Sequence, residues 1–178
     1  MNTAVKLRRA QMAQRLVRVE RSLKFAEDLP GFIVAVGDNW AVIQNIRDGG
    51  YFDGYSAFRI KDVVRIKRRK GFEQDYSRGL PTWPPRAPSP LALDNVASVL
   101  RSMAAAAQLV SIEQEERLSA QWIGTLVRSD ADITWLHEVR PDATWHEEPL
   151  GYKSKWITLI TIGSGYQEAL AAVAGSRS

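Results

Sequence analysis

The chain matches itself when it is displaced by 93 residues, and this internal repeat limits its possible folds more than any other feature. The matches run in the same order along both halves, with one extra residue near the end of the second. They pair Leu7 with Leu100, Arg8 with Arg101, Gly31 with Gly124, Val34 with Val127, Arg47 with Arg140 and Gly71 with Gly165. The period is too long for a solenoid repeat, so the sequence predicts two versions of one small domain.

A proline-rich segment separates the two versions. Residues 80–90 hold five prolines, which lack the backbone donors that helices and strands need and therefore favour an extended connector. Ser89 suits a helix N-cap and Pro90 suits the first helical position, so a helix is expected to begin there. We predict a first half at residues 1–79, a linker at 80–89 and a second half at 90–178.

Each half opens with a helical pattern and continues as short strands. Residues 17–25 alternate apolar and polar side chains, which predicts a strand. A single long helix through residues 5–23 is the alternative, and it fits the second half poorly because Gln114 and Glu116 interrupt the apolar stripe. Turns are expected at 47–50 and at Asp53-Gly54. Helices are expected over 3–14, 90–107 and 165–174, and the other strands over 32–36, 40–46, 57–60, 63–66, 123–128, 133–139, 150–153 and 156–162.

A helix followed by five short, strongly bent strands resembles the Sm-like fold, a small SH3-like barrel. The likeness rests on residues 31–43, where Gly31 stands early in a bent strand and Asp38 marks a turn before an apolar strand. Glycine permits such a bend because no side chain obstructs it. Residues 58–66 are similar to the second Sm motif. The resemblance, which extends to uncharacterised bacterial proteins with duplicated Sm-like domains, implies a mainly β fold of two tandem barrels, each preceded by an α-helix.

The resemblance is incomplete at the positions where Sm proteins bind RNA. RNA-binding members resemble one another in an asparagine four residues after the turn aspartate, and in a basic residue followed by glycine near the last strand. Val42 stands four residues after Asp38, and Thr134 takes the matching place in the second half. Only Lys70-Gly71 is similar to the basic pair. A base-reading pocket is therefore not expected, and the fold alone does not fix a function.

Composition excludes several kinds of chemistry. The chain has no cysteine and two histidines, which excludes disulfides, Cys-ligated zinc, iron–sulfur clusters and thiol nucleophiles. His137 and His146 lack a third convergent ligand, so no metal site is expected. No phosphate-binding glycine loop or nucleophile elbow occurs, and we expect neither a cofactor nor catalysis. Because no apolar run approaches about 18 residues and no secretion signal is evident, a cytoplasmic protein without a membrane partner is expected.

Charge is divided unevenly along the chain. Residues 1–90 hold 17 Lys and Arg against 9 Asp and Glu, whereas residues 91–178 hold 7 against 11. A cluster of cations attracts phosphates, and Phe72 and Tyr76 lie just beyond it, where they are expected to stack on bases. The sequence thus predicts a non-catalytic module that binds RNA or another nucleic acid weakly. The candidate nucleic-acid-binding residues are Arg59, Lys61, Arg65, Lys67, Arg68, Arg69 and Lys70.

Two other interpretations of the charges remain open. The cations can guard a strand end against edge-to-edge aggregation. Alternatively, the basic half of one molecule pairs with the acidic half of another, which would make the chain a protein-interaction module that forms homo-oligomers. Trp40, Trp135 and Trp156 fall in predicted strands and are expected in the core or in a peptide-binding groove.

Overall fold

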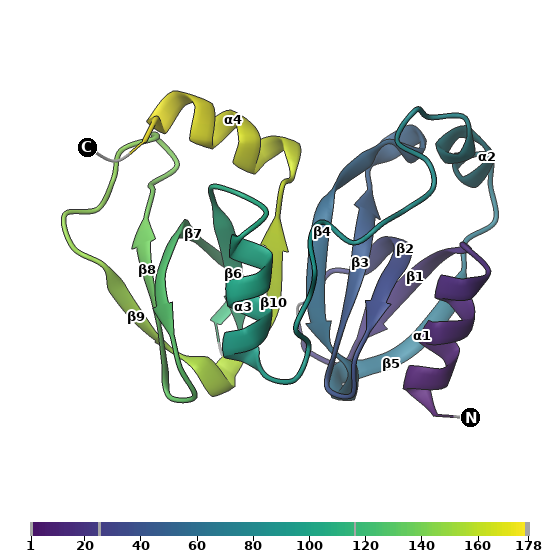
Figure 1. Ribbon diagram of the computed structural model, residues 1–178, viewed down its shortest axis with the longest axis horizontal. Coiled ribbons are helices and arrows are strands. Elements are labelled where there is room, and N and C mark those ends of the chain that lie inside the picture. The colour runs from purple at the N-terminus through teal and green to yellow at the C-terminus, as the bar shows by residue number, and fades with distance from the viewer. Residues whose placement is uncertain (1, 25, 116, 177–178) are drawn as a thin grey trace.

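The computed structural model describes residues 2–24, 26–115 and 117–176, and in these residues ten strands form one continuous antiparallel sheet (Figure 1). The strand order is β5-β1-β2-β3-β4-β10-β6-β7-β8-β9. The first half supplies β1 (Leu16–Arg21), β2 (Leu29–Val36), β3 (Trp40–Ile46), β4 (Phe52–Arg59) and β5 (Val63–Arg68). The second half supplies β6 (Val110–Gln114), β7 (Arg117–Ser129), β8 (Ile133–Glu138), β9 (Leu150–Lys153) and β10 (Ile157–Ile162).

Short helices and turns complete the chain. The α-helices are α1 (Thr3–Met12), α2 (Glu73–Arg78), α3 (Val96–Ala104) and α4 (Gly165–Ala174), and the 3-10 turns are η1 (Asp48–Gly50), η2 (Ile60–Asp62) and η3 (Ser154–Trp156). Polar side chains fix three helix starts: Asn2 and Asn95 accept from backbone N–H groups of α1 and α3, and Ser164 forms a capping box with Gln167. None of the helices in the described part of the chain has the length and apolar character needed to span a bilayer.

The prediction of a mainly β fold with helices is confirmed, and the two halves contribute their strands in the same order. Each half places its last strand beside its first, followed by the second, third and fourth. Residues 16–21 form β1, so the strand interpretation is right for residues 17–21 and the long-helix alternative is wrong. The strand ends at Arg21, so residues 22–24 do not continue it as predicted, and Phe25 lies outside the described residues. The halves meet where β4 pairs with β10, in the middle of Figure 1.

The largest apolar core cluster crosses this junction. It joins Trp40, Val42 and Ala57 of the first half to residues of α3 and β10 such as Leu100 and Ile160. A second cluster lies under α1, where Leu7 packs among residues of β1 and β2. Because the main core takes side chains from both sides of the predicted boundary, the division into 1–79 and 90–178 stays a prediction.

The connector is packed against the sheet, and the helix after it starts later than predicted. Trp83 contacts Phe32 with ring centroids 5.3 Å apart, and the backbone N–H of Arg86 donates to Gln44. The prediction that a helix begins at Ser89-Pro90 is wrong, because α3 starts after Asn95. The Asn95 side chain accepts from the N–H of Ser98, whereas the Ser89 hydroxyl donates to the carbonyl of Ser102.

Two further local predictions need correction. Asp53-Gly54 was expected as a turn, yet both residues lie within β4. Gly54 has a φ of +71°, and a Cβ there would overlap the carbonyl oxygen of Ile162 on β10, so this glycine serves the close approach of two backbones rather than a chain reversal. Helix α2 was not predicted, and Trp156 lies in η3 instead of a strand.

Candidate functional site

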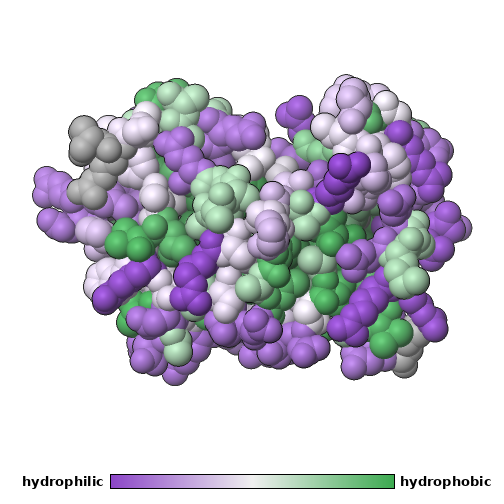
Figure 2. Space-filling view, viewed as in Figure 1, coloured by the Kyte–Doolittle hydropathy of each residue, from purple (hydrophilic) through white to green (hydrophobic). Residues whose placement is uncertain are grey.

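The structure separates the seven candidate residues into two places. Arg59 ends β4 and Lys61 lies in η2, both at the junction of the halves. The other five lie on β5, an outer strand of the sheet, or in the loop after it: Arg65, Lys67 and Arg68 on the strand, and Arg69 and Lys70 in the loop. Figure 2 shows strongly hydrophilic side chains around α1, in the half of the molecule that also contains β5. The predicted basic patch is therefore smaller than the sequence suggested.

Arg59 is a buried residue that joins the two halves. Its side chain donates to Asp62 at 2.5 Å and to Glu115 of the second half at 3.3 Å. It also donates to the backbone carbonyl of Lys155 at 3.4 Å. Only 6% of Arg59 is exposed, so its charge pairs with carboxylates inside the protein and does not face a nucleic acid at the surface.

The cations within β5 are partly neutralised by a neighbouring strand. Lys67 forms an ion pair with Glu20 on β1, and the Nε of Arg65 lies 3.8 Å from the same carboxylate. The hydrogen bond from Lys67, helped by the charge of Arg65, holds the pKa of Glu20 below its usual range. These two cations remain largely exposed, but each already has a counter-charge.

The cations at the end of β5 have fewer counter-charges than those within the strand. Arg69 donates to Glu73 at 2.8 Å, and a backbone hydrogen bond at Glu73, together with Arg69, keeps the pKa of that carboxyl low. Arg68 and Lys70 are exposed, and no ion pair to another described residue involves either of them. These two cations are therefore the most available to a phosphate.

Exposed aromatic rings lie next to these cations in sequence. Phe72 is 69% exposed, so its ring is open to solvent. Tyr76 on α2 stacks edge-on with Tyr51, with centroids 4.9 Å apart, and the guanidinium of Arg47 lies 5.4 Å from the Tyr51 ring. Sequence reasoning identified Phe72 and Tyr76 but missed Tyr51 and Arg47, because only the fold brings them to α2.

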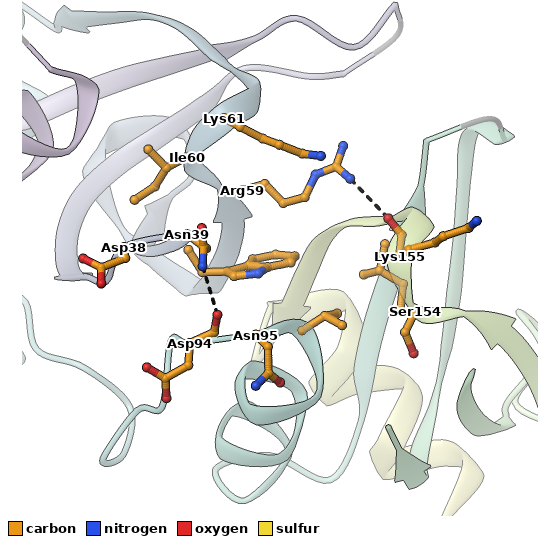
Figure 3. Close-up of a pocket in the computed structure, with 12 residues that line it drawn as sticks. Asp38, Asn39, Arg59, Ile60, Lys61, Asp94, Asn95, Ser154 and Lys155 are labelled. Atoms are coloured by element: carbon orange, nitrogen blue, oxygen red, sulfur yellow. Dashed lines mark hydrogen bonds between the residues drawn. The ribbon is translucent and has the colours of Figure 1, made fainter. Parts of the chain in front are cut away.

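A pocket of about 480 Å³ opens at the junction of the halves (Figure 3). Its lining includes Lys61 of η2 and Lys155 of η3, together with the acidic residues Asp38 and Asp94. The side-chain amide of Asn39 donates to the backbone carbonyl of Asp94 at 3.2 Å, which ties the β2–β3 turn to the segment before α3. The lining of the pocket therefore holds charged residues of both signs.

The two histidines lie in a separate cluster of the second half. The ring Nε2 of His137 lies 2.6 Å from the carbonyl oxygen of His146, and His146 lies 3.9 Å from Glu138. The hydroxyl of Tyr152 donates to Glu138, and burial raises the pKa of this carboxyl to about 7. Among the described residues, no three His, Cys, Asp or Glu side chains converge on a common point as metal ligands would.

Burial of Glu138 predicts a pH-dependent loss of stability. Its carboxyl is neutral in the folded protein until about pH 7, whereas in the unfolded chain it ionises near 4.5. Stability should therefore fall as pH rises from about 5 to 8, by about 2 kcal/mol relative to Glu138→Gln, which has no charge to bury. Urea unfolding at both pH values measures this difference. The exposed Glu148 is the control, because Glu148→Gln keeps Glu138 and should differ from wild type by the same amount at both pH values. A constant gap between Glu138→Gln and wild type would contradict the account.

Comparison of the chain with family models, with curated proteins and with solved structures gives no match. The site must therefore be interpreted from its own residues.

Proposed function

We propose that this protein is a non-catalytic binding module of two tandem Sm-like barrels, which binds single-stranded RNA or related nucleic acid weakly at the end of β5. The observation that carries the proposal is the exposed ring of Phe72, which closely follows Arg68 and Lys70 in the sequence, two exposed cations without ion pairs to other described residues. Cations that follow a backbone and a ring that stacks on a base are the two components of sequence-tolerant single-strand binding.

The Sm-like part of the proposal is supported by features that the two halves share. They have the same strand order, and a helix precedes the strands of each. Gly31 and Gly124 occupy equivalent places, and a Cβ at either would overlap the backbone of the next strand, at Gln44 or His137. Both glycines thus allow the close, bent strand pairing that a small barrel requires.

The same comparison argues against base-specific recognition. Val42, which stands where RNA-binding Sm proteins have asparagine, is fully buried in the main core. It offers a base neither a donor nor an acceptor. Binding is therefore expected to depend on phosphate charge and stacking, with little preference between sequences.

The alternative function, self-association through oppositely charged halves, has less support. Arg21 of the first half lies 3.5 Å from Glu113 of the second, and Arg59 lies 3.3 Å from Glu115. These cross-half ion pairs form within one chain, so part of the complementary charge is already used. We therefore favour nucleic acid as the partner of the remaining cations.

Two variants test the proposed surface. Arg68→Gln/Lys70→Gln removes charge and keeps polar side chains, so folding should be retained and the affinity for a mixed-sequence single-stranded RNA at low salt should fall at least about tenfold. Phe72→Ala should weaken binding by about 1–3 kcal/mol through lost stacking. Fluorescence anisotropy measures both effects.

The matched control removes two cations from the second half. Arg128 and Lys153 are exposed there and lie over the rings of Trp135 and Trp156. Arg128→Gln/Lys153→Gln should bind within about twofold of wild type, because its loss of charge is the same and only its place differs. If both double variants lower the RNA affinity equally, binding depends only on the net charge of the protein, which would contradict the proposal.

A further inference from the structure

The junction between the halves shows how these units pair edge to edge. β10 runs antiparallel to β4, with Leu159 opposite Phe58 and Ile162 opposite Tyr55. Leu159, Ile162 and Phe58 are each at least 96% buried. The paired edge is therefore apolar, and it is completed by the close approach at Gly54.

The repeat places the equivalents of these two strands at the outer edges of the sheet (Figure 1). In each half a 3-10 turn, η2 or η3, leads into a six-residue strand, so β5 corresponds to β10 with an offset of 94 residues. By the same offset β9 corresponds to β4. Nothing in the strand order alone would stop β5 of one molecule from pairing with β9 of the next, and such head-to-tail contacts would continue into rings or filaments.

The side chains of β5 oppose that pairing. Arg65, Lys67 and Arg68 stand where β10 has Leu159, Thr161 and Ile162. The register of the junction would set Arg65 against Tyr152 and Arg68 against Pro149. Neither of these residues offers a counter-charge. Arg65 keeps Glu20 at 3.8 Å, but Arg68 has no ion pair to another described residue, and burying its guanidinium without one is unfavourable. Glu147 and Glu148 would come opposite Lys70 and Arg69, beyond the end of both strands.

The other outer edge is protected in a different way. β9 has four residues, whereas β4 has eight. Pro149, immediately before β9, stands where β4 has Tyr55 and has no N–H to give to a ladder. A short strand, a proline and a row of Lys and Arg are the means by which natural sheets prevent edge-to-edge association.

We propose that both outer edges are closed to pairing with a second molecule, so that the chain is a terminated pair of units and is monomeric in solution. The apolar edges of β4 and β10 pair with each other within the chain, and the basic edge of β5 stays accessible to solvent. This inference is independent of nucleic-acid binding, and it opposes the homo-oligomer expected from the charge division.

Two variants that each open one edge test the proposal. Arg65→Leu/Lys67→Thr/Arg68→Ile gives β5 the side chains of β10, and Pro149→Tyr gives the β9 edge the residue of β4. Because each variant keeps one closed edge, each alone should sediment as a monomer of 20.0 kDa, as the wild type should. Mixed in equal amounts after nuclease treatment, they should form a complex of twice that mass and no larger, since its two remaining edges are closed.

Each other outcome overturns the proposal. A wild-type protein that sediments as a dimer or larger shows that the edges are open. A mixture that stays monomeric, with both variants folded by circular dichroism, shows that these residues are not the barrier. The control variant Lys6→Thr/Arg8→Leu/Arg9→Ile changes the same numbers of charged and apolar residues on α1, outside the strand that would pair. If it forms the complex with Pro149→Tyr equally well, general apolar association is responsible and the assigned register is wrong.

Discussion

Replacing Trp40 by alanine is expected to lower the free energy of unfolding by about 3–5 kcal/mol. Trp40 begins β3, is 4% exposed, and packs in the main core with residues of β4, α3 and β10. Removing the indole leaves a cavity that the rigid sheet around it fills poorly, so both lost burial and lost packing contribute. Chemical denaturation followed by circular dichroism measures the change.

The repeat supplies the control for this substitution. Ile133 begins β8 at the position equivalent to Trp40, but it is only partly buried. Ile133→Ala should therefore cost clearly less, by about 2 kcal/mol or more. A Trp40→Ala protein within about 0.5 kcal/mol of wild type would mean that the indole is not part of the core, and the junction described above would be wrong.

Removing the side chain of Arg59 is expected to cost about 3–5 kcal/mol, because it leaves a buried carboxylate without its partner. Asp62 is itself 6% exposed and lies 2.5 Å from the Arg59 guanidinium. Glu115 loses its contact as well, so Arg59→Ala also weakens the link between the halves. Urea unfolding at neutral pH measures the loss.

Two comparisons separate this effect from simple truncation. Arg59→Met/Asp62→Asn removes both charges while keeping similar volume, and it should be more stable than Arg59→Ala. Arg78 and Asp75 have the same i,i+3 spacing at 3.9 Å but are exposed, so Arg78→Ala should cost about 1 kcal/mol or less. Equal losses in Arg59→Ala and Arg78→Ala would contradict the buried junction.

Local patterns predicted much of the fold. Residues 40–46 and the helix over 165–174 have the predicted bounds, because the apolar strand and the Ser164 cap are complete signals within a few residues. The start of α3 was mispredicted because Ser89-Pro90 has the residue types of a helix start, whereas in the structure Asn95 caps the helix. Gly54 was read as a turn because its positive φ has the same sequence signal in a turn and in a close backbone contact.

The site was less predictable because its residues depend on contacts between the halves. Arg59 looked like a surface cation, but it ends β4, which the pairing with β10 carries into the interior. Its partner Glu115 is 56 residues away, and sequence spacing gives no indication of that contact. Arg68, Lys70 and Phe72 are exposed at the end of β5, and their role in nucleic-acid binding stays a prediction.

The salt dependence of RNA binding tests the central claim most directly. Anisotropy of a mixed-sequence single-stranded RNA with the unmodified protein, titrated from low to physiological salt, gives the slope of log affinity against log salt. Two to four phosphates at the end of β5 predict a slope of about −1.5 to −3, since each contact on a single strand contributes about −0.7. An absence of binding at low salt, or binding with no salt dependence, would contradict the proposed function.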